Sequence, residues 1–347
     1  MEFGKVSKVD EVDFSLPPDD PMTDDLFREL ATRNEAPVQL HVGCTQWGNK
    51  DWIGKVYPKG TKDKDFLAHY VQQFNAIELN ALFYNLQPKS VIERWASLAG
   101  SEFRFCPKFL NTISHTKQLQ HTEQETALFI DHMQSFGSRL GHSFLQLSDG
   151  FGPDRAAVLQ EYIRQLPTDF RTCIELRQQN WFAGSKNTSS IPDKTGQNEL
   201  HERKRNGMET EIPPSSAIQR EWESRLPAVQ QTWELFRQLG IGTVITDSSG
   251  RRDVIHMRLT APVAFIRFVA NNGHPTDFLR IDAWAERLKT WIDKGLHEIY
   301  FIVHSHNEIH APELVHYTIE EFNKKCGTTL KPPRLLKDNE SKNLTLF

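Results

Sequence analysis

Short apolar runs alternate with longer amphipathic segments over about 290 residues of this chain, and this alternation limits the folds it can adopt. The apolar runs predict strands at residues 38–44, 76–82, 103–108, 143–147, 171–177, 242–247, 264–269 and 298–304. The amphipathic segments predict helices at residues 64–74, 90–98, 124–140, 154–166, 230–239, 281–292 and 312–325. About eight strand–helix repeats in a row are typical of a closed (β/α)₈ barrel. We therefore predict an α/β fold of the TIM-barrel type, with an open, doubly wound parallel sheet as the alternative.

One polar segment, residues 184–227, interrupts the alternation. It has no clear period and contains the basic run Arg203-Lys204-Arg205, so it predicts a long loop or a partly disordered insert. Because it follows a strand, it would rise on the catalytic face of a barrel, either as a lid or as a tolerated surface insertion. The predicted organisation is an N-terminal tail or capping segment at 1–35, one barrel domain at 36–330 with this insert, and a C-terminal tail at 331–347.

Charge, cysteine spacing and the length of apolar runs argue against several classes of protein. The chain has 347 residues and a formal net charge of −4, which argues against a broad nucleic-acid surface, since such surfaces are usually basic. Its four cysteines are far apart and fit neither a disulfide framework nor a CxxC zinc pattern, so a reduced, cytoplasmic location is expected. There is no apolar run of about 18 residues, and we expect no membrane-spanning helix.

Polar side chains stand at the predicted carboxyl ends of the strands, which gather around one pocket in a TIM barrel. In the second strand, Glu78 and Asn80 are two residues apart and are predicted to share a face. The other strand-end candidates are Lys108, Gln146, Glu175, Arg177, Asp247, Arg267, His304, His306 and Asn307. Charges this dense add little net stability inside a barrel, but they shift one another's pKa values, as acid–base sites require.

Five of these residues are predicted to be catalytic: Glu78, Lys108, Glu175, Asp247 and His304. Either glutamate would act as the general base, with the aspartate or the histidine as the partner acid. Arg177, Arg267 and Lys108 would hold anionic or hydroxyl groups of a substrate. Structural alternatives remain open: Glu175 and Arg177 can form a plain ion pair, Lys108 can extend to solvent, and Asp247 can cap a turn.

Further substrate contacts are predicted in the loops that follow the strands. Aromatic side chains there, Trp47, Tyr84 and Trp181 among them, would suit a small polyol or a flat ligand. His115, in the loop after the third strand, is a candidate proton shuttle. A divalent metal is possible, because His304 and His306 are two residues apart on a strand, but no HExxH motif or cysteine cluster supports it. No cofactor is firmly predicted, since GxGxxG, Walker and GxSxG motifs are missing.

Several of these motifs resemble those of the YecE-like family, domain of unknown function 72. The matching residues include Gly43-Cys44-Thr45-Gln46-Trp47, Trp52-Ile53-Gly54 and Tyr57-Pro58, then Phe74, Ile77, Glu78, Asn80, Phe83 and Tyr84. Later matches are Arg94-Trp95, Phe103, Phe105, Lys108, Thr112-Ile113-Ser114-His115, Gln146-Leu147, Glu175-Leu176-Arg177 and Trp181-Phe182. The resemblance covers roughly residues 38–320 and implies a TIM barrel and, by analogy, a sugar-isomerase-related or other carbohydrate-type enzyme.

The chain also departs from the family's pattern, which indicates a distinct subgroup. Ser148-Asp149 follows Gln146-Leu147 where the family has a Pro-Pro turn, and Gln178 follows Arg177 where the family has a histidine. We expect an enzyme that acts on a small polar, sugar-like or phosphorylated substrate by acid–base chemistry, as an isomerase or a hydrolase. The alternatives are a non-catalytic metabolite-binding or scaffold barrel and a metal-dependent, phosphodiester-directed barrel. The oligomeric state is left open.

Overall fold

The computed structural model describes residues 4–31, 37–182 and 215–336. Eight parallel strands form one sheet in the order β3-β2-β1-β8-β7-β6-β5-β4. Their bounds are β1 (Gln39–Cys44), β2 (Ala76–Leu79), β3 (Arg104–Pro107), β4 (Ser143–Gln146), β5 (Thr172–Glu175), β6 (Gly242–Asp247), β7 (Val263–Ala270) and β8 (Glu298–Ser305). The predicted TIM barrel is confirmed.

Strands β3 and β4 close the barrel through a few contacts rather than a full ladder. An isolated parallel bridge joins Lys108 to Phe144, and the amide of Phe109 donates to the carbonyl oxygen of Phe144 at 3.1 Å. On the opposite side, β1 pairs with both β2 and β8. The approach of β1 to β2 is so close that a Cβ atom on Gly43 would lie 1.8 Å from the carbonyl oxygen of Ala76, so this position requires glycine.

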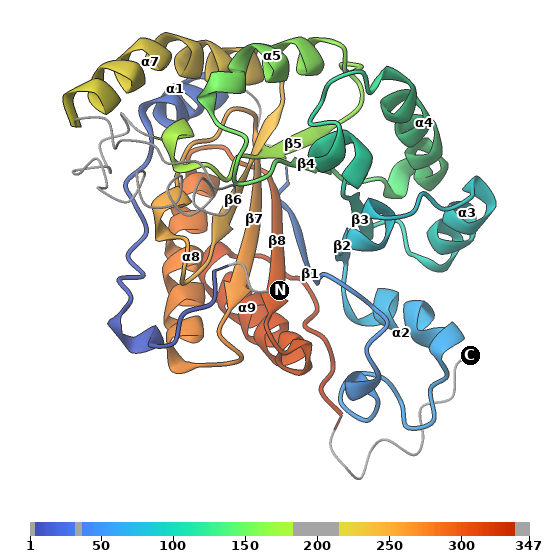
Figure 1. Cartoon of the computed structure of the whole chain (residues 1–347). Coiled ribbons are helices and arrows are strands. Elements are labelled where there is room, and N and C mark those ends of the chain that lie inside the picture. The colour runs from blue at the N-terminus through green and yellow to red at the C-terminus, as the bar shows by residue number, and fades with distance from the viewer. Residues whose placement is uncertain (1–3, 32–36, 183–214, 337–347) are drawn as a thin grey trace.

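Helices cover the outside of the barrel (Figure 1). They are α1 (Pro21–Leu30), α2 (Phe66–Gln73), α3 (Lys89–Leu98), α4 (Glu123–Met133), α5 (Ala156–Arg164), α7 (Ser215–Gln238), α8 (Pro275–Asp293) and α9 (Ala311–Cys326). Figure 1 shows α8 and α9 beside β6–β8, and α3 and α4 on the side of β3. No helix in the described part of the chain is long and apolar enough to cross a membrane.

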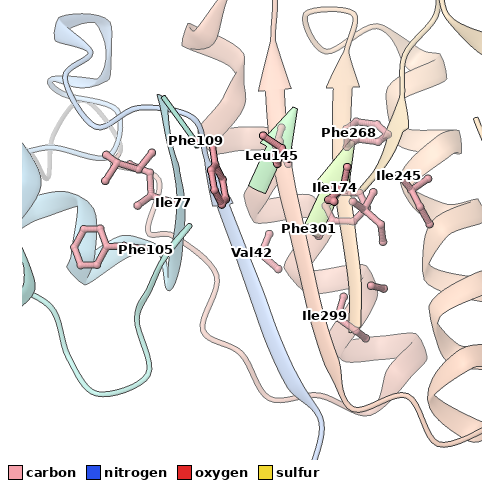
Figure 2. Packing of buried hydrophobic residues seen from close by; sticks show 14 of the residues in the cluster. Val42, Ile77, Phe105, Phe109, Leu145, Ile174, Ile245, Phe268, Ile299 and Phe301 are labelled. Atoms are coloured by element: carbon pink, nitrogen blue, oxygen red, sulfur yellow. The ribbon is translucent and has the colours of Figure 1, made fainter. Parts of the chain in front are cut away.

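Alternating strand residues divide the core into two layers. The outer layer, between strands and helices, includes Val42, Ile77, Leu145, Ile174, Ile245 and Phe301, which Figure 2 shows packed around the strands. The inner layer lies inside the barrel and consists of Ala76, Cys106, Phe144, Cys173, Val244, Ala261, Val263, Phe265, Tyr300 and Ile302. The residue two positions after an inner residue also points inward, so alternation determines which strand-end side chains face the inside of the barrel.

Three of the differences between predicted and observed elements have a clear local cause. Strand β2 ends at Leu79, and a 3₁₀ turn, Asn80–Phe83, supplies the buried Leu82 and Phe83 that extended the apolar run. Helix α4 ends at Met133 rather than continuing to 140, because a 3₁₀ turn follows in which Gly137 has φ +56°.

The third difference concerns the predicted insert at 184–227. Its last part is helical, since α7 begins at Ser215 rather than at 230. The serines of the proline–serine stretch, Ser215 and Ser216, are the first residues of this helix, and Pro227 lies inside it. Residues 184–214 of the insert, with the basic run 203–205, lie outside the described residues.

The segments expected to be tails make specific contacts. Helix α1 buries Leu26, Phe27 and Leu30 against the barrel, and the Thr23 hydroxyl donates to the carbonyl oxygen of Met257 at 2.7 Å. Figure 1 shows the chain before α1 passing beside α8. At the other end, the amide of Leu336 donates to the carbonyl oxygen of Lys55 at 2.7 Å, and residues 337–347 lie outside the described residues.

Candidate functional site

A ring of polar side chains continues the inner layer of the barrel at its carboxyl end. On seven strands, the position two residues after an inner apolar residue carries a polar group, and alternation points that group into the barrel. These positions are Glu78 after Ala76, Lys108 after Cys106, Gln146 after Phe144, Glu175 after Cys173, Thr246 after Val244, Arg267 after Phe265 and His304 after Ile302. The fold therefore gathers residues that are up to 226 positions apart in the chain.

At the middle of this ring lies an ion-pair group, here called the inner arginine centre, formed by Arg267, Glu78 and Glu175. Arg267 donates from Nε and Nη2 to the two oxygens of Glu78, at 2.8 and 2.9 Å. Its Nη1 donates to Oε2 of Glu175 at 2.8 Å. The three side chains are at most 2% exposed, so their charges must be balanced within the protein.

Both carboxylates of the inner centre have all their acceptor positions filled. A carboxylate has about four lone-pair positions. Besides Arg267, Glu78 accepts from Asn80 at 2.9 Å and from Nε2 of His304 at 3.0 Å. Glu175 accepts from three further groups: Arg177 Nε at 2.8 Å, Thr246 Oγ1 at 2.8 Å and Gln146 Nε2 at 2.6 Å. Each carboxylate thus has four donors, and neither has an oxygen left to accept a substrate proton.

The pKa values of these groups agree with that geometry. Burial acts to raise the pKa of Glu78, but the positive Arg267 and the His304 ring outweigh it and hold the pKa well below its usual value. For Glu175, burial is outweighed in the same way by Arg177 and Arg267, and its pKa is also lowered. Both glutamates are therefore ionised near neutral pH and act as fixed negative charges rather than as bases.

Lys108 stands beside the inner centre without joining its ion pairs. Its Nζ donates to Oε1 of Gln146 at 2.7 Å and lies 4.0 Å from the centre of the Phe83 ring. Burial, and then the positive charge of Arg267, lower the pKa of Lys108 to about 8. This side chain can therefore gain and lose a proton near physiological pH.

Two histidines adjoin the lysine and the carboxylates. His115 lies edge-on to the Phe83 ring with centroids 5.1 Å apart, and its Nδ1 is 2.8 Å from the hydroxyl of Ser114. Burial, and then Lys108, lower the pKa of His115 to about 4, so the ring is neutral at pH 7. Burial also lowers the pKa of His304, whose neutral ring donates from Nε2 to Glu78.

Asp247, predicted to be catalytic, points away from this ring. It follows Ile245, an outer residue, and its side chain lies between the strands and α8. There it forms an outer arginine centre with Arg280 and Asp277, with Arg280 at 2.9 Å from Asp247 and 3.3 Å from Asp277. Trp284 also donates to Asp247, at 2.8 Å. Strand alternation sends Thr246 inward and Asp247 outward, so the aspartate does not reach the candidate site.

Other predicted contacts also lie apart from the ring. Trp181 is buried and donates to the carbonyl oxygen of Phe151 at 2.8 Å, so it belongs to the core. The Asn307 side chain accepts from the amide of Ile309 and caps a short turn.

The remaining three predicted residues lie beyond the strand ends. Trp47 packs edge-on against Trp95, with centroids 5.1 Å apart, and Tyr84 is 80% exposed. His306 follows the end of β8 at Ser305, so it does not continue the strand with His304. Among the residues that the structure describes, no group of three His, Cys, Asp or Glu side chains is placed to hold a metal ion.

Two residues near the ring were not predicted. Thr246 donates to Glu175, and the alternation of strand 242–247 could have identified it. Glu308, just after β8, accepts from the Thr45 hydroxyl at 3.1 Å, while its buried Oε2 has no hydrogen-bond partner among the described residues. Burial, assisted by the negative charge of Glu78, raises the pKa of Glu308 to about 7. No sequence pattern in this chain marks that residue.

The chain is similar to proteins of one family over most of its length. The family model described as "Protein of unknown function DUF72" matches residues 41–195 and 219–337. The UPF0759 protein YecE of Escherichia coli K12 is 26% identical over 287 residues, which cover 82% of this chain and 93% of that protein. The UPF0759 protein YunF of Bacillus subtilis is 33% identical over 69 residues, 20% of this chain and 23% of that protein.

Solved structures of similar fold include DUF72 family proteins from two bacteria. A DUF72 family protein from Enterococcus faecalis V583 superposes with a TM-score of 0.56 and 16% identity, covering 85% of this chain and 98% of that one. A DUF72 family protein from Thermotoga maritima MSB8 gives a TM-score of 0.52 and 18% identity, covering 84% of this chain and all of that one (100%). At these identities the likeness concerns the fold alone.

Proposed function

The chain belongs to the DUF72 family of proteins of unknown function, and from its charge arrangement we propose that it is an enzyme that moves a proton on a small polar substrate. The substrate class is a sugar-like or phosphorylated carbonyl compound, and no cofactor is needed for the step. Lys108 is the group that gives and takes the proton. This assignment replaces the glutamates as general base, because both carboxylates are saturated by donors.

The observation that carries the proposal is the setting of Lys108. It is buried at a strand end, donates to a neutral amide oxygen, and forms no ion pair with a described carboxylate. A lysine that only stabilised the fold would pair with Glu78 or Glu175, which instead pair with arginines. A pKa close to the working pH is what general acid–base catalysis requires.

The charges around Lys108 favour an anionic or hydroxyl-rich substrate. Three cationic groups, Lys108, Arg177 and Arg267, face two carboxylates, so the ring carries a net positive charge when the lysine is protonated. Arg177 has a side chain that is 12% exposed, more than that of Arg267 at 2%, which suits contact with a ligand. A phosphate or carboxylate group near Arg177 would balance the excess charge.

Hydrogen–deuterium exchange tests the proposal without knowledge of the product. The full-length protein is incubated in D₂O with a panel of aldoses, ketoses and their phosphates, and deuterium beside the carbonyl group is followed by NMR. We expect exchange with at least one compound and a loss of about 10²–10³-fold in Lys108→Met. The control, Asp247→Asn, changes a buried acid outside the ring and should retain the exchange rate.

Two outcomes would count against the proposal. Equal exchange in the wild-type protein and Lys108→Met would remove the lysine from the reaction. Ligand binding without exchange would favour the alternative of a metabolite-binding barrel. The proposed substrates are metabolites of the cytoplasm, and the four free thiols fit a reducing compartment.

A further inference from the structure

The surroundings of Lys108 suit covalent chemistry as well as proton transfer. We propose that Lys108 forms an imine with the aldehyde or ketone carbon of the substrate. This inference deepens the proposed function, on which it rests, by naming the reacting group of the substrate and the atom that attacks it. In the imine form Lys108 moves the proton indirectly: the iminium ion acidifies the neighbouring C–H group, and water takes that proton to leave an enamine.

The first argument is that the nitrogen of Lys108 is held in place without being neutralised. Its hydrogen bond to Gln146 fixes the position of Nζ at 2.7 Å from a neutral oxygen, and the Phe83 ring covers one side at 4.0 Å. The amide group of Gln146 is itself fixed, because its Nε2 donates to Glu175 at 2.6 Å. An amine held by neutral groups loses its proton more readily than one paired with a carboxylate.

The second argument concerns the charged groups that face Lys108 from the neighbouring elements. Glu78 on β2 and Glu175 on β5 act to keep it protonated, whereas Arg267 on β7 and Arg177 after β5 favour its neutral form. Burial adds to the effect of the arginines, and the residue is 8% exposed. A desolvated lysine beside other cations is a known arrangement for a nucleophilic amine.

The chemical step balances without any further reactant. The ammonium group of Lys108 first loses a proton, and the lone pair of Nζ forms a bond to the carbonyl carbon while the π electrons move to oxygen. Proton transfer from nitrogen to that oxygen gives a carbinolamine. The proton lost at the start returns to the hydroxyl group of the carbinolamine, the carbon–oxygen bond then breaks, water leaves, and the product is a protonated imine. The net change is ammonium plus carbonyl compound to iminium plus water, so the positive charge is retained.

The neighbours can serve that step from where they stand. The iminium charge replaces the ammonium charge beside Glu78 and Glu175, so the electrostatic balance of the ring is unchanged. His115 is neutral and lies on the same Phe83 ring as Lys108. Its Nδ1 faces Ser114, and with a pKa of about 4 it is too weak a base for the proton that Lys108 loses, so that proton passes to solvent water.

Reductive trapping of the full-length protein tests the proposal. Glycolaldehyde is the probe, sodium cyanoborohydride reduces any imine at about pH 7.5, and peptide mass spectrometry locates the hydroxyethyl group. Lys55 is the internal control, because it is also partly buried but donates to Ile309 at 2.7 Å and pairs with Glu313 at 3.1 Å. We expect Lys108 to be modified at least about tenfold faster than Lys55, with no stable product when the reductant is omitted.

A second measurement separates failure of the imine from failure of the proposed function. Competitive acetylation with acetic anhydride across pH reports the titration midpoint of Lys108. If no glycolaldehyde adduct forms and the titration midpoint of Lys108 lies near 8, the imine is overturned and proton transfer stays in place. If no adduct forms and the midpoint lies near 10.5, both the imine and proton transfer by Lys108 are overturned. Equal modification of Lys108 and Lys55 would also overturn the imine.

Discussion

Two buried arginines in this barrel have the same formal arrangement, one guanidinium between two carboxylates, yet only one belongs to a candidate site. The inner centre places Arg267 between Glu78 and Glu175. The outer centre places Arg280 between two aspartates, and its remaining donors reach carbonyl oxygens of the backbone. Both centres are almost fully buried, so burial and ion pairing alone do not identify function.

The difference lies in what stands next to each centre. Beside the inner one are a lysine and a histidine whose pKa values are about 8 and 4. Beside the outer one, the indole of Trp284 donates to Asp247, and the Phe268 ring lies 4.2 Å from the guanidinium of Arg280. The outer centre is thus closed by groups that do not titrate near neutral pH. A buried ion pair indicates a reactive site when titratable neighbours are left outside its pairing.

The largest expected effect comes from removing either arginine. Arg267→Met and Arg280→Met each leave one buried carboxylate without a cation, Glu78 or Asp277, and we expect a loss of about 3–5 kcal/mol in the free energy of unfolding. The second carboxylate of each centre keeps one arginine, Arg177 on Glu175 and Arg252 on Asp247. Urea denaturation followed by circular dichroism measures this loss. Only Arg267→Met should also raise the pKa of Lys108, because Arg267 lowers it in the wild-type protein. A raised Lys108 pKa in Arg280→Met would show that the two centres are coupled.

Replacing one carboxylate in each centre should have a smaller effect. Glu175→Gln and Asp247→Asn keep the side-chain shape, and we expect each to cost about 2–3 kcal/mol. Because Glu175 acts to raise the pKa of Lys108, its replacement should move the acetylation midpoint of that lysine below 8, whereas Asp247→Asn should leave it in place. An unchanged midpoint in Glu175→Gln would contradict the charge balance described for the inner centre.

Removing the lysine should stabilise the protein. The pKa of Lys108 is lowered from 10.5 to about 8, so between these values the unfolded chain binds a proton that the folded protein has released. Wild-type stability therefore rises with pH across that window, and below pH 8 the buried charge opposes folding. We expect Lys108→Met to be about 1–2 kcal/mol more stable near pH 7, with the difference vanishing by about pH 10.5. A destabilised variant at pH 7 would mean that the lysine is retained for structure.

The smallest effect concerns Glu308, which belongs to neither centre. Its pKa is raised from 4.5 to about 7, so the folded protein binds more protons than the unfolded chain in that window, and stability is lost as pH rises through it. We expect Glu308→Gln to remove this slope, a gain of about 0.5–1 kcal/mol at pH 7 in thermal unfolding across pH. Glu313→Gln is the control, since that half-exposed side chain pairs with Lys55. A slope that persists in Glu308→Gln would assign it to another group.

The fold and much of the site could be predicted from the sequence, because both depend on local patterns. Apolar runs with polar ends indicate barrel strands, and strand ends in a barrel meet around one pocket. The structure does place Glu78, Lys108, Glu175 and Arg267 together. Asp247 was misplaced because the prediction used the end of the strand and ignored which face each residue occupies. The inner alternation of Val244 and Thr246 excludes it.

The roles of the residues could not be predicted in the same way. Whether a carboxylate is a base or a fixed charge depends on how many donors reach it, and those of Glu78 come from three separate elements. Likewise, one partner of Asp247 is Arg280, 33 residues away on a helix. Such pairings depend on distances that only the folded chain sets.

The segment before the barrel has a consequence for the timing of folding. Thr23 meets Met257, 234 residues later in the chain, and Asp19 meets Arg287, 268 residues later. At a synthesis rate of about 5–20 residues per second, Asp19 and Thr23 wait on the order of tens of seconds before their partners leave the ribosome. During that interval the apolar side of α1 has no surface to cover. We therefore expect nascent chains halted before residue 257 to bind chaperones through α1, and released full-length chains to lose that binding.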